Sequence, residues 1–234
     1  AILTRIRKEG VTEVWLWGAR CRHGRPDASG PQWRDPDDQD PDPMSVQLGT
    51  PPRGSVPIHL STAAGFAALA AQQPAATRLW LKTVGFAGAP DRHALVPGAD
   101  GRLQAVWAGV RSADDPWALG ALPMTLPEGD YHLAEAALAL DNGAAALSWE
   151  LGAYRFDAYK AARRPPARLH LASRSATQRA LIVATAIAST RDLVNTPAEH
   201  MGPAELAEAV RLVARQHGAT FKQTVGDQLP GAGF

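Results

Sequence analysis

The seven histidines are the first residues to consider for chemistry, because imidazole groups and carboxylates together bind catalytic metal ions. They stand at positions 23, 59, 93, 132, 170, 200 and 217, and none forms the His-x-x-x-His pair that places two ligands on one helix face. Glu199 and His200 are adjacent, and adjacent side chains on a helix point about 100° apart, so they do not chelate one ion together. The pair favours a loop or helix-capping role, and the spacing predicts no metal site.

Other catalytic arrangements are incomplete in this sequence. A serine nucleophile at a strand-to-helix turn needs Gly-x-Ser-x-Gly, and that pattern is absent. The lone cysteine, Cys21, lies between Arg20 and Arg22, a setting that can activate a thiol, but an inert thiol is the favoured interpretation. The Gly-x-Gly at 231–233 follows Pro230 rather than a strand, so it does not indicate a phosphate-binding loop. The residues by themselves therefore predict no catalytic and no metal-binding side chain.

Composition limits the classes of protein that the elements can build. The chain has 234 residues, a net charge of +1, 45% hydrophobic residues and 20% charged residues, which suits one large domain or two small ones. The charge balance argues against a nucleic-acid partner and against a polybasic membrane-surface protein. The sequence has no uncharged apolar run of about 18 residues, so a membrane-spanning helix is not expected. The single Cys excludes a disulfide framework and fits a reducing compartment, so a cytoplasmic protein is expected.

Residues 1–53 differ from the rest of the chain. Arg34–Pro43 holds five Asp and three Pro in ten residues, and its like charges and scarce apolar side chains predict disorder. We interpret 1–53 as a disordered leader, with an acidic metal- or protein-binding tail as the alternative. Met44 follows directly, and an authentic start there or soon after is a further hypothesis.

Strand and helix patterns alternate from Ser55 onward, which predicts an α/β fold. Val56–Leu60 is expected to be an edge strand, because Pro57 cannot donate a hydrogen bond to a neighbouring strand. Ser61 is a favourable N-cap for an alanine-rich helix over 62–73.

The same patterns complete a small N-terminal α/β domain at 54–159. Its other expected elements are a β-hairpin at 93–97 and 102–110, a strand at 130–134 and a helix at 142–152. Residues 160–168 are basic and hold two prolines, which is typical of a linker, and a nucleic-acid-binding patch is the alternative. A second domain is expected to begin at 169.

The last third of the chain is strongly helical. A broad apolar stripe predicts a buried helix over 176–194, which Asn195–Pro197 ends. Pro203 is expected to begin the next helix, and Thr220–Val225 has the pattern of a strand.

One segment in this region is distinctive. Thr190–Pro197 has the sequence T-R-D-L-V-N-T-P, and Met201–Ala207 has the sequence M-G-P-A-E-L-A. Together they resemble the start of the catalytic domain of the leucyl aminopeptidase (cytosol aminopeptidase) family, in which a long helix carries R-D-L-V-N-T-P before a Pro-initiated helix. Asp115–Gly120, Leu126–Tyr131 and Leu151–Phe156 are similar to the small N-terminal domain of a bacterial branch of that family.

The resemblance implies a metal-dependent leucyl aminopeptidase, in which two divalent cations (Mn or Zn) activate water and bind the N-terminus of a peptide substrate. The family holds these metals with a lysine and carboxylates in K-G-x-x-F-D-T-G-G-like and N-T-D-A-E-G-R-like stretches, and neither stretch occurs here. No catalytic or metal residue is therefore carried over. The chain is expected to be an inactive N-terminal fragment of a longer protein, and that full-length protein is expected to be a cytoplasmic homohexamer.

Five residues stand out at the start of the incomplete catalytic domain, which is assigned to 169–234: Arg191, Asp192, Asn195, Thr196 and Pro197. Asn and Pro are turn residues, so a structural corner between two helices is the favoured role. A direct substrate role for Asn195 or Asp192 is the alternative. At the level of the whole chain, the alternatives are a stand-alone, non-catalytic α/β binding or assembly module and an unrelated α/β enzyme.

Overall fold

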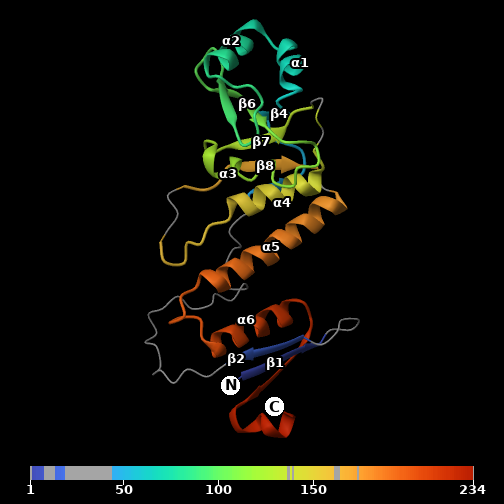
Figure 1. Ribbon diagram of the computed structural model, residues 1–234, viewed down its shortest axis with the longest axis vertical. Helices are drawn as coiled ribbons and strands as arrows, with labels where there is room; N and C mark the ends of the chain where they lie inside the picture. Colours follow the sequence, from blue (N-terminus) through green and yellow to red (C-terminus); the bar gives the residue numbers. More distant parts are fainter. Residues whose placement is uncertain are drawn as a thin grey trace. The chain divides into compact units, whose positions relative to one another are not determined.

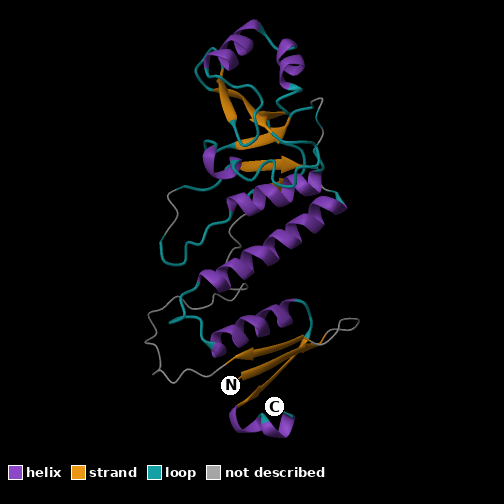
Figure 2. Ribbon diagram, viewed as in Figure 1, coloured by secondary structure: helices purple, strands orange, loops and turns teal. Residues whose placement is uncertain are grey.

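The computed structural model describes residues 2–7, 14–18, 44–135, 138, 140–160, 164–172 and 174–233. The chain divides into two compact units. One is Pro43–Ser189, and the other combines Ala1–Asp42 with Thr190–Phe234. Figures 1 and 2 show their elements, and each unit is described by itself.

The larger unit is built on a six-stranded mixed sheet in the order β3-β8-β7-β4-β6-β5. All neighbouring strands are parallel except β5 and β6, which form an antiparallel hairpin. The strands are β3 (Val46–Leu48), β4 (Val56–Ser61), β5 (His93–Pro97), β6 (Leu103–Gly109), β7 (Asp130–Leu133) and β8 (Arg168–Leu171). The parallel strands therefore bring their carboxyl ends to one edge of the sheet.

Five helices accompany these strands and confirm the predicted α/β class. They are α1 (Phe66–Ala71) and α2 (Ala75–Thr83) between β4 and β5, α3 (Leu122–Thr125) between β6 and β7, α4 (Asn142–Ala153) between β7 and β8, and α5 (Ser175–Asn195) after β8. The hairpin and the helices predicted at 142–152 and 176–194 are confirmed. The predicted burial of the helix at 176–194 is wrong, because the buried residues of α5 are Thr177, Leu181 and Ala184 alone.

One face of the sheet packs against α4. The strands alternate, so Tyr131 of β7 and Leu169 of β8 point into this core, where they join Trp149 of α4. Trp149 is fully buried, and its indole N–H donates to the carbonyl of Ala167 at 3.1 Å. This bond satisfies the one polar atom of a large core side chain and fixes α4 against the start of β8.

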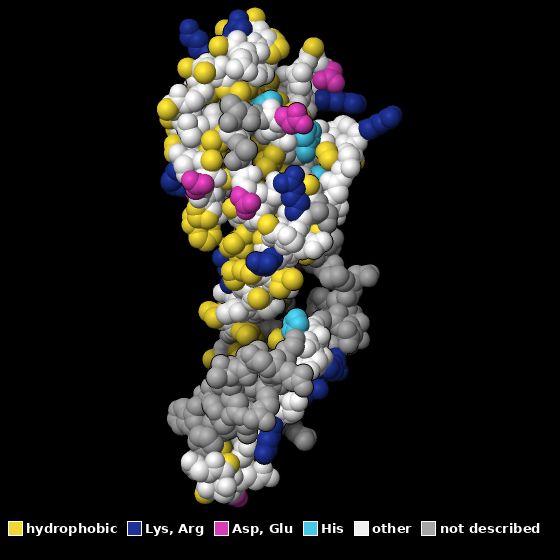
Figure 3. All heavy atoms as spheres, turned by 90° about the vertical axis from the view of Figure 1, so that its right-hand side faces the viewer, with side chains coloured by type: hydrophobic (Ala, Val, Ile, Leu, Met, Phe, Trp, Pro, Cys, Tyr) yellow, Lys and Arg dark blue, Asp and Glu magenta, His cyan; other side chains and the backbone are white. Residues whose placement is uncertain are grey.

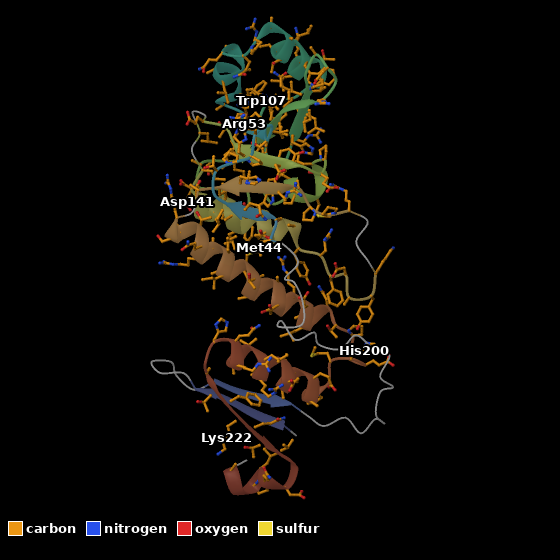
Figure 4. All side chains as sticks on the ribbon, turned by 180° about the vertical axis from the view of Figure 1, so that it is seen from behind. Met44, Arg53, Trp107, Asp141, His200 and Lys222 are labelled. Atoms are coloured by element: carbon orange, nitrogen blue, oxygen red, sulfur yellow. The ribbon has the colours of Figure 1, made fainter. Side chains whose placement is uncertain are left out.

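The opposite face is covered by α1 and α2 over only part of its width. Trp107 of β6, labelled in Figure 4, is fully buried there and contacts the rings of Phe66 and Phe86 edge-on. Leu81 of α2 belongs to the same cluster. Farther along this face, β7 and β8 carry polar side chains in place of apolar ones.

The predicted edge position of Val56–Leu60 is wrong, because β4 lies between β7 and β6. The Ile58 carbonyl accepts the Ala134 N–H on the β7 side at 2.9 Å, so the position of the missing Pro57 N–H faces β6. β6 pairs with β4 only from Ile58 onward, so Pro57 removes no ladder bond. The helix predicted over 62–73 is also shorter, because β4 continues through Ser61, whose carbonyl accepts the Val110 N–H.

A half-buried carboxylate, that of Glu150, ties the edge strand β3 to α4. Ser45 accepts the Leu169 N–H through its carbonyl, so the next N–H, that of Val46, faces away from β8. Glu150 of α4 accepts this N–H through Oε1 at 2.5 Å. Burial raises the pKa of Glu150, although hydrogen bonds from Val46 and Ser45 oppose the shift.

The smaller unit contains a three-stranded antiparallel sheet in the order β2-β1-β9. The strands are β1 (Ile2–Arg7), β2 (Val14–Gly18) and β9 (Thr220–Val225), and helix α6 (Pro203–Gln216) packs against β1 and β9. Short 3-10 turns follow at Gly226–Gln228 and Pro230–Ala232. The predicted helix start at Pro203 and the predicted strand at 220–225 are confirmed.

The structure differs from the predicted leader and linker. β1, β2 and β3 all lie within 1–53, whereas Cys21 and Arg34–Pro43 lie outside the described residues. β8 belongs to the six-stranded sheet, so the larger unit continues past the boundary expected at 159. The polar segment 160–168 has the sequence of a linker. The pairing of the strand that follows it, β8, with β7 and β3 is long-range and is not visible in the local sequence. Among the described helices, none is both long enough and apolar enough to cross a membrane.

The close approach of two glycines gives a prediction. A Cβ on Gly152 of α4 would lie 1.9 Å from the Gly120 carbonyl oxygen, whereas a Cβ on Gly120 would have its nearest neighbours at 3.4 and 3.5 Å. We expect Gly152→Ala to lower the free energy of unfolding by about 2 kcal/mol, because backbone overpacking outweighs the helix propensity of Ala. Gly120→Ala is the control and should change stability little in urea titrations. Equal stability of the two variants would contradict this packing.

Glu150 gives a second prediction, on pH dependence. Its folded pKa is raised above the ordinary value of 4.5, so its contribution to stability is full below that value and is lost as the pH rises through the folded pKa. Glu150→Gln keeps an acceptor for Val46 but cannot ionise. The variant should therefore gain stability relative to the parent as the pH rises from 4 to 8, measured by urea unfolding. The exposed Glu128→Gln variant is the control, and a parallel pair of pH profiles for Glu150→Gln and the parent would refute the assignment.

Candidate functional site

A cavity of about 720 Å³ lies at the carboxyl ends of β3, β7 and β8. Its walls are the loop Gly49–Pro51 after β3, the ends of β7 and β8, and Asn142 at the start of α4. Open parallel sheets bind their ligands at this edge, because the loops and helix N-termini that follow the strands meet there. The cavity is therefore the candidate site in the larger unit.

Local backbone bonds hold two of these walls. The Gly49 N–H donates to the Leu171 carbonyl at 2.9 Å, and Gly49 has φ +133°, a conformation that glycine adopts most readily. Asp141, labelled in Figure 4, caps α4 by accepting the Ala144 N–H at 2.9 Å. The cap fixes where α4 begins and so places Asn142 in the wall.

An ion-pair cluster lies beside the cavity on β7 and β8. Arg168 donates to both carboxylate oxygens of Asp130, each at 2.9 Å, and His170 Nε2 lies 2.8 Å from Asp130 Oδ1. The hydrogen bonds from Arg168 hold the pKa of Asp130 well below its usual range, and His170 adds to the shift while burial opposes it. The cluster orients His170, which lines the cavity. In Figure 3, His side chains gather on this unit near acidic ones.

His132 provides the second imidazole of the cavity, and Ser55 is its hydrogen-bond partner. Its Nδ1 lies 2.9 Å from Ser55 Oγ, and it faces His170 in the β7–β8 register. Burial lowers the pKa of His132, and the neighbouring His170 lowers it further. A neutral imidazole can both donate and accept a hydrogen bond, so this side chain suits an uncharged partner.

These contacts do not form a catalytic triad. A triad needs one histidine between the nucleophile and the carboxylate, whereas here Ser55 contacts His132 and Asp130 contacts His170. Anion binding is also disfavoured, because no Lys or Arg is among the described lining residues and Asp141 already occupies an N–H of the α4 N-terminus. The lining includes one carboxylate, that of Glu135, so the arrangement suits a neutral or cationic ligand that makes hydrogen bonds.

Within the described parts of the chain, no three His, Cys, Asp or Glu side chains are grouped so that they could hold a metal ion. The described residues therefore do not fit the two-metal centre that the resemblance implies. No catalytic step through a metal can be assigned to them.

The five corner residues lie in and after the last turns of α5. The backbone N–H and Oγ1 of Thr196 both donate to the Asp192 carbonyl, at 3.0 and 2.7 Å, and the His200 N–H donates to the Pro197 carbonyl at 2.8 Å. Arg191 lies in α5, and Asn195 is the last residue of that helix. This stretch belongs to the smaller unit, whereas the cavity belongs to the larger one.

Sequence reasoning missed Asp130, His132, Arg168 and His170 as a group. The signal was present as two short strands, D-x-H and R-x-H, in which residues two apart share a face. Helical spacing of histidines does not reveal such a group, and the pairing of β7 with β8 joins segments almost 40 residues apart in the sequence.

Comparison with known proteins agrees with this architecture. The sequence profile of "M17 aminopeptidase, N-terminal domain" matches residues 56–172. Probable cytosol aminopeptidases are similar: that of Rhodococcus opacus is 36% identical over 94 residues, covering 34% of this chain and 19% of that protein. That of Nocardia farcinica is 32% identical over 108 residues, covering 41% and 22%. The chain thus spans about a fifth of the length of these relatives.

Solved structures extend the similarity beyond the matched domain. The cytosol aminopeptidase of Coxiella burnetii aligns over 75% of this chain and 38% of its own, with a TM-score of 0.68 and 33% identity. A tomato leucine aminopeptidase mutant aligns over 74% and 42%, with a TM-score of 0.58 and 17% identity, which supports the fold alone. Because the N-terminal-domain profile covers half of the sequence, this chain belongs to the M17 aminopeptidase family.

Proposed function

We propose that the chain is the N-terminal part of a metal-dependent leucyl aminopeptidase that removes N-terminal residues from peptides. The observation that carries the proposal is the family match over residues 56–172, together with the similarity to a cytosol aminopeptidase structure. In this proposal the six-stranded sheet is the N-terminal domain, and α5, α6 and β9 open the peptidase domain.

The metal centre of the proposed enzyme lies outside the described residues. Two divalent cations, Mn or Zn, would activate water and polarise the scissile carbonyl when bound. One structurally similar protein, the bottromycin maturation enzyme BotP, has been solved in complex with Mn. This chain contributes the supporting fold and the corner at Asn195–Pro197, and we propose that it is inactive alone.

Exposed apolar side chains on α5 support a larger assembly. Ile182 is 67% exposed and Val183 is 42% exposed within the larger unit, although both lie in a helix with an apolar stripe. Such surfaces are usually covered in the complete protein. A cytoplasmic homohexamer is the assembly proposed for the full-length protein, with peptides as substrates.

The cavity at the carboxyl ends of β3, β7 and β8 favours a second candidate function. Its two imidazoles, the Asn142 amide and the Glu135 carboxylate can make hydrogen bonds to a small neutral or cationic molecule, as a non-catalytic binding module would. In that case the chain would act by binding or assembly and not by peptide hydrolysis.

The activity proposal is tested with the 234-residue chain and leucine p-nitroanilide. We expect no release of p-nitroaniline above the blank with Mn²⁺ or Zn²⁺ added, because no described group of side chains can hold either ion. The Coxiella burnetii enzyme in the same buffer is the control for the assay. Release that requires added metal and is abolished by a chelator would overturn the proposed inactivity and place a metal site within these 234 residues.

A further inference from the structure

Among the described strands, β5 is the outermost of the six-stranded sheet on the hairpin side. The Arg92 carbonyl accepts the Gly109 N–H at 2.8 Å, so Arg92 faces β6. Backbone direction alternates along a strand, so Ala94 and Val96 also face β6. The N–H and C=O groups of His93 and Leu95 therefore point outward, where a further strand could pair with them.

A side chain from α2 occupies this edge. The indole N–H of Trp80 donates to the Leu95 carbonyl at 2.8 Å, and α2 packs against β5. Pro97, the next outward-facing position, has no N–H to offer. Two of the groups that a pairing strand would use are thus already occupied or missing.

The opposite edge of the sheet is closed in the same way. The outward-facing Val46 N–H of β3 is bound by Glu150 of α4 at 2.5 Å. Each edge strand therefore has one outward backbone group bound by a side chain from a neighbouring helix. Unpaired edges are templates for association, and proteins protect them with such devices.

We infer that Trp80 closes the β5 edge against pairing with a second copy of this chain. An antiparallel edge strand is complementary to itself about a two-fold axis, so Leu95 could face Leu95 of the second copy and exchange two N–H···O=C bonds. The Trp80 indole N–H occupies the carbonyl that this exchange requires. Pro97 would then lie opposite His93 of the second copy and, lacking an N–H, would make one hydrogen bond instead of two. The Leu95–Leu95 pair would therefore contribute most of the main-chain bonding.

The surface around this edge would favour such pairing if the indole were removed. Leu79 of α2 is 66% exposed, Val84 directly after α2 is 49% exposed, and Leu95 of β5 is exposed. Pairing at β5 would bring the exposed Leu95 side chains of the two copies together, and β-strand addition gains both main-chain bonds and side-chain contacts. Trp80 thus protects an edge strand that carries an exposed apolar side chain.

The test compares Trp80→Ala with the parent 234-residue chain by sedimentation velocity over a range of concentrations. We expect Trp80→Ala to strengthen self-association by about tenfold, the effect of one hydrogen bond, and to slow amide exchange at His93 and Leu95 in a concentration-dependent way. Leu79→Ala is the matched control, because it removes an exposed apolar side chain from the same helix without freeing the edge.

A second change decides whether the edge itself is responsible. Leu95→Pro removes an outward N–H and no bond to β6, so Trp80→Ala/Leu95→Pro should return to the parent's behaviour. If Trp80→Ala fails to give the parent's circular dichroism spectrum, Trp80→Phe, which keeps a ring without the N–H, takes its place. Unchanged association of the folded variant would overturn the inference, and so would association that Leu95→Pro does not reverse.

Discussion

The packing of α4 against the sheet is the constraint on which the larger unit depends. Trp149 fills the core beneath β7 and β8, and its indole N–H binds the Ala167 carbonyl at the start of β8. Gly152 allows the helix to approach the Gly120 carbonyl so closely that no side chain fits at position 152. One helix thereby fixes the position of β8, the edge of β3 and the wall of the cavity.

The two faces of the six-stranded sheet differ in polarity, because α4 covers one of them and the other is covered only in part. The face under α4 is apolar throughout, whereas the opposite face is covered by α1 and α2 only near β6 and β5. The uncovered part carries the Asp130–Arg168 pair, which satisfies its charges and orients His170 toward the cavity. This part of the sheet thus places a polar cluster beside the cavity.

Local sequence patterns predicted the helices and strands, whereas long-range pairing determined the strand positions in the sheet and the contacts between segments. The apolar periodicity of α5, the proline that begins α6 and the hairpin turn before β6 were all readable, because each depends on neighbouring residues. The interior place of β4 was not, since Pro57 is tolerated only because β6 pairs from Ile58 onward. The His132–His170 pair and the Trp80–Leu95 bond were missed for the same reason, because each joins segments that only the sheet brings together.

β8 lies in the six-stranded sheet, and the match to the family's N-terminal domain includes it. Native-state hydrogen exchange of the 234-residue chain is the direct test of whether β8 unfolds with the rest of this sheet. We expect the amides of β8 to open with those of β4 and β7, at one free energy and with one denaturant dependence. Exchange of β8 at a separate, lower free energy, while β4 and β7 stay protected, would contradict it.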